Sequence, residues 1–170
     1  ELLRRRADAL DAFEKRLAYA QAHLDEPAIC DRPPLRLLRL SLSELSAADM
    51  KNRRSLDAFI AAMPDTRISF VRALAPKSEK HFRLCADEAA CAAWALPLEH
   101  TASLPSVRCV RVIHRFACQP WDDEAVPEIL ACAQKAGHAV RVDGELFGLH
   151  LASETSEGKV FLYAAVYLPI

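Results

Sequence analysis

The sequence predicts an α+β domain made of two similar β-α-β-β halves, preceded by a long amphipathic helix. Three observations lead to this prediction. A heptad pattern of leucines runs through residues 1–27, a strand-helix-strand-strand pattern follows at 35–86, and the same order returns at 107–168. Two such halves can pair their edge strands into one antiparallel sheet with both helices on one face. We therefore divide the chain into a coiled-coil helix at 1–27 and a small-molecule-binding domain at 33–170.

The helix prediction rests on leucines that fall seven residues apart, which is the spacing of a coiled-coil seam. Pro27 ends the pattern. An isolated helix of this length is marginal in water, so it needs a partner. We expect a homodimer through residues 3–24, and the alternative is that the seam packs on its own domain. The seam consists of Leu3, Leu10, Leu17 and Leu24, with Arg6, Phe13 and Ala20 three positions further on.

The first half begins with a strand pattern at residues 35–42. Leu56, Phe59, Ile60 and Met63 then form one apolar helix stripe, which Pro64 terminates. Strand patterns follow at 67–74 and 80–86. The long connection after them contains a short alanine-rich helical stretch at 91–95, and we treat the residues around Pro33 as a linker.

The second half begins with a strand at 107–116. A helix at 123–136 follows, and Gly137 suits the position just beyond its end. Strands at 145–152 and 160–168 are joined by Ser-Glu-Gly-Lys at 156–159, which is a hairpin signal.

Composition excludes several classes of protein. The 170 residues suit one domain plus an appendage, since domains commonly have ~100–200 residues. Lys and Arg number 22 against 23 Asp and Glu, a balance that argues against a nucleic-acid-binding surface over the chain as a whole. No apolar run reaches the ~18–20 residues that span a bilayer, and no signal peptide begins the chain. We therefore expect a cytoplasmic protein without membrane contact. Because the chain lacks an initiator methionine, we expect a longer protein upstream.

The cysteines indicate neither a metal site nor a disulfide framework. No pair has the C-x-x-C spacing of a zinc site, and a chain with 52% hydrophobic residues needs no disulfides to fold. We expect buried thiols in a reducing compartment, with no metal and no cofactor. The cysteines are Cys30, Cys85, Cys91, Cys109, Cys118 and Cys132.

Three features together resemble a known family. The order of elements, the helix followed by Gly137, and the terminal Val-Phe-Leu-Tyr-Ala-Ala-Val-Tyr-Leu-Pro-Ile look like the GyrI-like effector-binding domain. A heptad helix directly in front of it resembles the dimerisation helix of MerR-family transcription regulators. The resemblance implies an antiparallel helix pair and a domain that senses a drug or metabolite. It also implies that DNA is bound only through an N-terminal domain absent from this chain.

One position departs from the family pattern. Relatives that bind cationic drugs place a buried carboxylate in an aromatic pocket, within a Glu-x-Tyr sequence. Here the expected Glu falls near Gly148 and the expected Tyr near His150. A neutral ligand is therefore as well supported as a cationic one.

The last two strands hold the candidate ligand-binding residues. Phe161, Tyr163 and Tyr167 alternate onto one face, with Ala165 leaving room between them. Aromatic rings with polar tips suit a wall that stacks a flat ligand, although such a stripe can also be plain core. Glu145 is either a cation-recognising charge or an exposed strand-start carboxylate. The candidates are Tyr163, Tyr167, Phe147, His150, Glu145, Phe161 and Trp121; the histidine could instead be a satisfied strand residue and the tryptophan a packing residue.

No catalytic motif is present. The sequence lacks G-x-S-x-G, H-E-x-x-H, a P-loop and G-x-G-x-x-G, so we do not expect an enzyme. The predicted function is effector sensing in a ligand-responsive transcription regulator, with a small aromatic or lipophilic molecule bound between the two halves. The alternatives are a stand-alone GyrI-like module for a protein partner, or a small hydrolase that uses Glu145, Tyr163 and Trp121.

Overall fold

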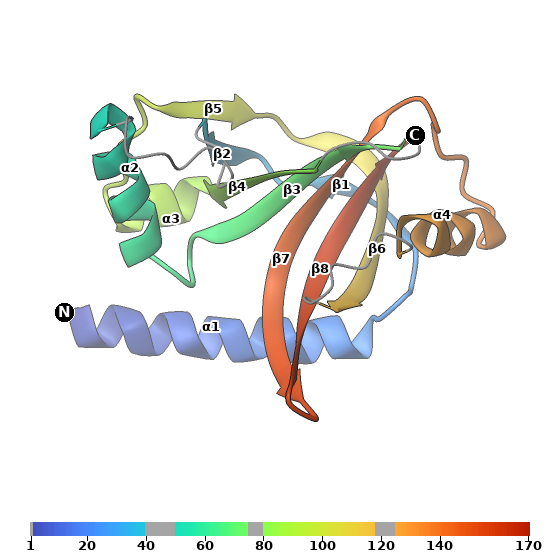
Figure 1. Ribbon diagram of the computed structural model, residues 1–170, viewed down its shortest axis with the longest axis horizontal. Coiled ribbons are helices and arrows are strands. Elements are labelled where there is room, and N and C mark those ends of the chain that lie inside the picture. The colour runs from blue at the N-terminus through green and yellow to red at the C-terminus, as the bar shows by residue number, and fades with distance from the viewer. Residues whose placement is uncertain (1, 40–49, 75–79, 118–124) are drawn as a thin grey trace.

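The computed structural model describes residues 2–39, 50–74, 80–117 and 125–170 (Figure 1). Within these ranges the chain forms four helices and one curled sheet of eight strands in the order β1-β6-β8-β7-β3-β4-β2-β5. All neighbouring strands are antiparallel. The helices are α1 (Leu2–Ala22), α2 (Met50–Ala61), α3 (Glu88–Ala93) and α4 (Ala125–Lys135). The strands are β1 (Ala28–Arg32), β2 (Leu35–Leu38), β3 (Arg67–Ala73), β4 (Lys80–Ala86), β5 (Thr101–Leu104), β6 (Val107–Ala117), β7 (Glu145–Ser156) and β8 (Lys159–Pro169). The α+β class is confirmed.

Helices cover both faces of this sheet. On one side, which we call the α1 face, Leu17 and Ala20 of α1 pack on the strands. On the opposite face, Phe59 of α2 packs with residues of β2 and β4, and Ile129 of α4 packs with residues of β6 and β8. The two helices that follow the first strand of each predicted half thus share one face, and α1 lies across the other (Figure 1).

The C-terminal strand β8 is central in the sheet, which explains its apolar sequence. Because side chains alternate across a strand, Tyr163, Ala165 and Tyr167 lie on the α1 face while Val166 and Leu168 lie on the opposite face. All five side chains are buried. Both faces of β8 therefore belong to the core, and the β7–β8 hairpin predicted from the sequence is the middle of the structure.

Helix α1 uses only part of its leucine seam for packing on its own sheet. Ala20 is fully buried and Leu17 packs on the same core cluster. Towards the N-terminus, Leu3 is 83% exposed and Leu10 is 60% exposed. The packing alternative therefore holds for Leu17 and Ala20, and Ala9 is also buried, whereas Leu3 and Leu10 face solvent.

Two strands were absent from the sequence prediction. The residues around Pro33 were expected as a linker and no strand was expected before them, yet β1 pairs with β6 along its whole length. The connection after β4 contains β5, which pairs with β2. Both strands are short and lie at the sheet edges, where prolines such as Pro27, Pro33 and Pro105 next to a strand are tolerated. The predicted strand at 35–42 is described as far as Leu38, and residues 40–49 lie outside the described part of the chain.

The described cysteines are free thiols, namely Cys30, Cys85, Cys91, Cys109 and Cys132. Burial raises the pKa of Cys85 to about 11, so this thiol is protonated and inert at neutral pH. Cys118 lies outside the described residues. In the same ranges, no helix combines the length and apolar composition that crossing a bilayer requires.

Candidate functional site

A cavity of about 200 Å³ opens on the α1 face beside the aromatic side chains of β7 and β8. We call it the apolar cavity. Most of its lining is hydrophobic or aromatic, and two charged side chains are found among the described residues that border it. The lining residues are Arg32, Val71, Leu104, Val107, Cys109, Glu145, Leu146, Phe147, Tyr167, Leu168 and Pro169.

Strand register brings the two aromatic rings of this cavity together. Phe147 of β7 lies directly opposite Tyr167 of β8, and their ring centroids are 6.3 Å apart. On its other side Phe147 is paired with Val71 of β3. The cavity therefore lies at the β3–β7 pairing, where residues 35–86 meet residues 107–168. Burial, followed by the nearby Cys30, raises the pKa of Tyr167 to about 12, so its hydroxyl stays protonated.

Arg32 is the site residue that the sequence analysis missed. It is only 6% exposed, and its guanidinium lies 4.9 Å from the centroid of the Phe147 ring. Its Nη2 donates to the carbonyl oxygen of Pro105 at 2.6 Å. Burial lowers the pKa of Arg32 from its ordinary value, yet an arginine keeps its charge. The cavity thus has a fixed positive charge on one aromatic wall.

Glu145 stands at the rim of the apolar cavity as an exposed side chain at the start of β7. No ion pair to Glu145 occurs within the ranges that the structure describes. Its position leaves both sequence alternatives open, since the carboxylate can reach a ligand at the entrance or remain in solvent.

Tyr163 and Phe161 lie further along the same face, near the β7–β8 turn, and do not line the cavity. The Tyr163 hydroxyl donates to Oε1 of Glu154 at 2.9 Å. Arg115 Nη2 lies 2.7 Å from the same oxygen, and Gln21 of α1 donates to Oε2 at 3.1 Å. These bonds, led by that from Tyr163, lower the pKa of Glu154. The guanidinium of Arg115 also lies 3.5 Å from the centroid of Phe161. This group links α1 to the hairpin.

His150 points to the opposite face of the sheet. It borders a small cavity of about 30 Å³ with Phe70 and Phe82, and its Nε2 lies 2.8 Å from Ser153 Oγ. Burial lowers the pKa of His150. Strand alternation therefore separates this histidine from Phe147 and Tyr167. Trp121 lies outside the described residues.

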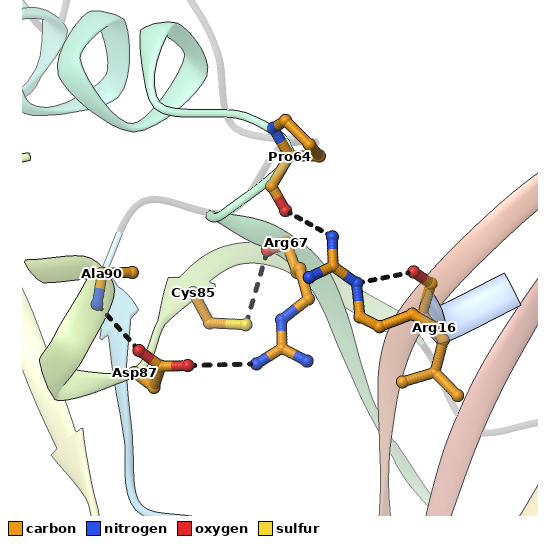
Figure 2. A network of polar contacts seen from close by, with 7 residues as sticks. Arg16, Pro64, Arg67, Cys85, Asp87 and Ala90 are labelled. Atoms are coloured by element: carbon orange, nitrogen blue, oxygen red, sulfur yellow. Dashed lines mark hydrogen bonds and ion pairs between the residues drawn. The ribbon is translucent and has the colours of Figure 1, made fainter. Parts of the chain in front are cut away.

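A second, polar cavity of about 320 Å³ lies between α1, β3 and α3. Its lining includes Arg16, Asp65, Arg67 and Asp87. Figure 2 shows Arg16, Arg67 and Asp87. The sequence gives no sign that these residues lie together, because they come from separate elements. In the ranges described here, no group of three or more His, Cys, Asp or Glu side chains is arranged to hold a metal ion.

Comparison with known proteins identifies no family. No family model matches the chain, and no curated protein matches it. Among solved structures, the chain is similar to a candidate bacterial transcription regulation protein from Staphylococcus aureus MU50. That match has a TM-score of 0.43 and 10% sequence identity, and it covers 85% of this chain and 99% of the other. A similarity at this level establishes neither a family nor a function.

Proposed function

We propose that this chain is the effector-sensing part of a ligand-responsive transcription regulator, and that it binds a small, uncharged aromatic or lipophilic molecule in the apolar cavity. The observation that carries the proposal is the cavity itself: about 200 Å³, bordered by Phe147 and Tyr167 and by aliphatic side chains. A concave, mostly apolar site with a few convergent polar groups is the usual form of a small-molecule site. We propose a binding function without catalysis.

The strand order supports a GyrI-like arrangement of two halves. Moving outward from the β3–β7 pairing, one side runs β3, β4, β2 and the other runs β7, β8, β6. In each predicted half, the second strand (β3 or β7) therefore lies at the centre, the third (β4 or β8) lies next to it, and the first (β2 or β6) lies outermost. Helices α2 and α4 follow the first strand of each half and pack on the same face. This pseudo-symmetry agrees with the duplication that the sequence predicts.

The charges of the cavity favour an uncharged ligand. The guanidinium of Arg32 already lies over the Phe147 ring, where a cationic ligand would otherwise gain a cation–π contact. A cation in the same cavity would be repelled by Arg32. The carboxylate of Glu145 is exposed at the rim, where solvent weakens its attraction for a cation.

We expect 2-naphthol, a flat uncharged probe, to stabilise the protein, whereas 2-naphthylmethylammonium should do so much less. At a concentration one hundred times its Kd, a ligand adds ~2.7 kcal/mol to the free energy of unfolding. For a chain of this size that corresponds to a rise in Tm of roughly 5–10 °C. Thermal unfolding followed by circular dichroism measures the shift.

Leu104→Trp is designed to fill the apolar cavity from the edge strand β5, and it should abolish the shift. Val142→Trp is the matched control, because Val142 is exposed and lies outside the cavity. A shift that survives Leu104→Trp would place the probe elsewhere and remove the proposed site.

For the regulator part, the full-length protein should bind DNA upstream of its own gene in a mobility-shift assay; no DNA binding with or without ligand would contradict it.

We also propose that α1 forms a homodimer through its exposed leucines. Leu2, Leu3 and Leu10 are all more than half exposed, although they lie on an otherwise polar helix. Leu3→Glu combined with Leu10→Glu should convert a dimer into a monomer in sedimentation equilibrium. Leu98→Glu changes an exposed leucine outside α1 and should leave the dimer intact. A wild-type monomer at high micromolar concentration would disprove this part of the proposal.

A further inference from the structure

We propose that the polar cavity between α1, β3 and α3 binds a small organic monocarboxylate, held by the guanidinium groups of Arg16 and Arg67. The cavity has a volume of about 320 Å³, and three alanines of α3 form part of its wall. Figure 2 shows both arginines together with the main-chain and carboxylate groups around them. This inference is independent of the ligand proposed for the apolar cavity, because the two cavities share no lining residue.

Arg16 brings a positive charge to the cavity without an acidic partner. Its Nε donates to the carbonyl oxygen of Leu151 at 3.3 Å, and its Nη2 donates to that of Pro64 at 3.1 Å. Both acceptors are neutral. Within the described ranges no carboxylate lies within ion-pair distance of Arg16. The two carbonyls fix the orientation of the guanidinium, and Asp65 and Asp87 offset its charge only from beyond ion-pair distance.

The guanidinium of Arg67 has hydrogen-bond donors without an acceptor among the described residues. Its side chain is 13% exposed, and Nη2 lies 3.7 Å from Oδ2 of Asp87, which is longer than a hydrogen bond. No hydrogen bond from the Arg67 guanidinium to any described residue is present. A guanidinium carries five N–H donors, and those of Arg67 that lack a protein acceptor are available to a ligand. The cavity is the space in which an acceptor can reach them.

The two aspartates that border the cavity are already engaged. Asp65 accepts the indole N–H of Trp94 at 2.8 Å. Asp87 caps α3 by accepting the main-chain N–H of Ala90 at 2.8 Å. Each carboxylate is therefore held by its own structural bond, and both act on Arg16 only through longer-range attraction that partly opposes the lowering of its pKa.

The arginines also repel each other. The pKa of Arg16 is lowered first by burial and second by the charge of Arg67. An anion placed between the two guanidinium groups would remove this repulsion and satisfy their free donors. Charge-assisted hydrogen bonds from arginine to an oxyanion are about twice as strong as neutral ones.

The side chains that line the polar cavity favour a monocarboxylate over other anions. The planar fork of arginine matches the two oxygens of a carboxylate. Asp65 and Asp87 border the same space and would repel a dianion such as phosphate more strongly than a single negative charge. The methyl groups of Ala89, Ala90 and Ala93 offer an apolar wall for a short alkyl or aryl group.

The test is calorimetric titration of the full chain with propionate, compared with propionamide at equal ionic strength. We expect saturable binding of propionate only. Arg16→Gln and Arg67→Gln should each weaken it by about tenfold or more, as expected for the loss of a charge-assisted bond. Arg108→Gln is the control for the loss of an arginine charge, since Arg108 lines neither cavity, and this variant should bind propionate like the wild type.

A variant that keeps both arginines tests the cavity even if the arginine variants misfold. Ala89 is exposed on α3 and borders the cavity. Ala89→Leu keeps a good helix former and all the charges, and it should block propionate by filling the space. The proposal is overturned if propionate does not bind, if binding survives both Arg67→Gln and Ala89→Leu, or if propionamide or phosphate binds as tightly. None of these results changes the 2-naphthol experiment, which tests the other cavity.

Discussion

Gly148→Ala should lower the free energy of unfolding by about 3 kcal/mol, the upper part of the usual range for overpacking a core. Gly148 of β7 lies directly opposite Phe70 of β3, and a Cβ atom at position 148 would overlap the Cζ edge of the Phe70 ring. That ring is buried and packs at 6.0 Å from Phe82 and 5.8 Å from Phe116. It therefore has little freedom to move aside.

Urea denaturation measures this loss, and a double-mutant cycle with Phe70→Leu identifies its cause. If the clash with Phe70 is responsible, the double variant loses less stability than the sum of the two single losses. Additive losses would show that the cost at position 148 has another origin.

The same clash bears on ligand charge. The cation-recognising glutamate that the sequence pattern leads us to expect falls near this position. Here position 148 faces Phe70 on the opposite side from the apolar cavity, and no side chain fits there without displacing the ring. This agrees with the uncharged ligand that we propose from Arg32.

The second large effect is expected from Ala20→Arg, which should detach α1 from the sheet. Ala20 is fully buried in the core cluster that contains Leu149 and Tyr163. Burying an arginine there without an acidic partner would cost several kcal/mol. Undocking the helix avoids that cost, because α1 alone is only marginally stable while the sheet keeps its packing on the opposite face. Hydrogen exchange of residues 2–22 should then approach that of an unfolded segment.

Ala18→Arg supplies the control for this experiment. Ala18 lies on the exposed side of the same helical turn, so the added charge and length are identical while the core is untouched. Its amides should remain as protected as those of the wild type. Protection of α1 in Ala20→Arg at the wild-type level would mean that this contact does not hold the helix.

Periodicity predicted most of the fold. The β7–β8 hairpin has two long apolar runs around Ser156 and Gly158, and both strands appear with bounds close to those expected. Helix α4 ends before Gly137, which has a φ of 83°, as a residue beyond a helix end often does. Strands β1 and β5 were missed because they are short, with five and four residues, and lie next to prolines. A segment of that length shows little periodicity. Their pairing depends on partners that are distant in the sequence.

The part of the candidate site that could be predicted is the face of the sheet on which each side chain lies, because alternation within one strand determines it. Alternation along β8 correctly put Tyr163 and Tyr167 on one face, but only strand register reveals that Tyr167 borders a cavity while Tyr163 binds Glu154. The parity of β7 already separates His150 from Phe147. The arginines depend on tertiary contacts: Arg32 reaches Phe147 through a missed edge strand, and Arg16 meets Arg67 only because α1 docks on the sheet.

The docking of α1 at two places has a mechanical consequence. Ala20 is held in the core near one end of the helix, and nearer the other end Ala9 is only 3% exposed and Arg5 Nη1 donates to the carbonyl oxygen of Ala93 in α3 at 2.8 Å. Ala9 and Ala20 lie about 16 Å apart along the helix axis at ~1.5 Å per residue. Because both parts are anchored, α1 can shift only as one rigid rod. Arg16 lies between the anchors and contacts Leu151 and Pro64, so a change in its contacts would move the exposed leucines together with the whole helix.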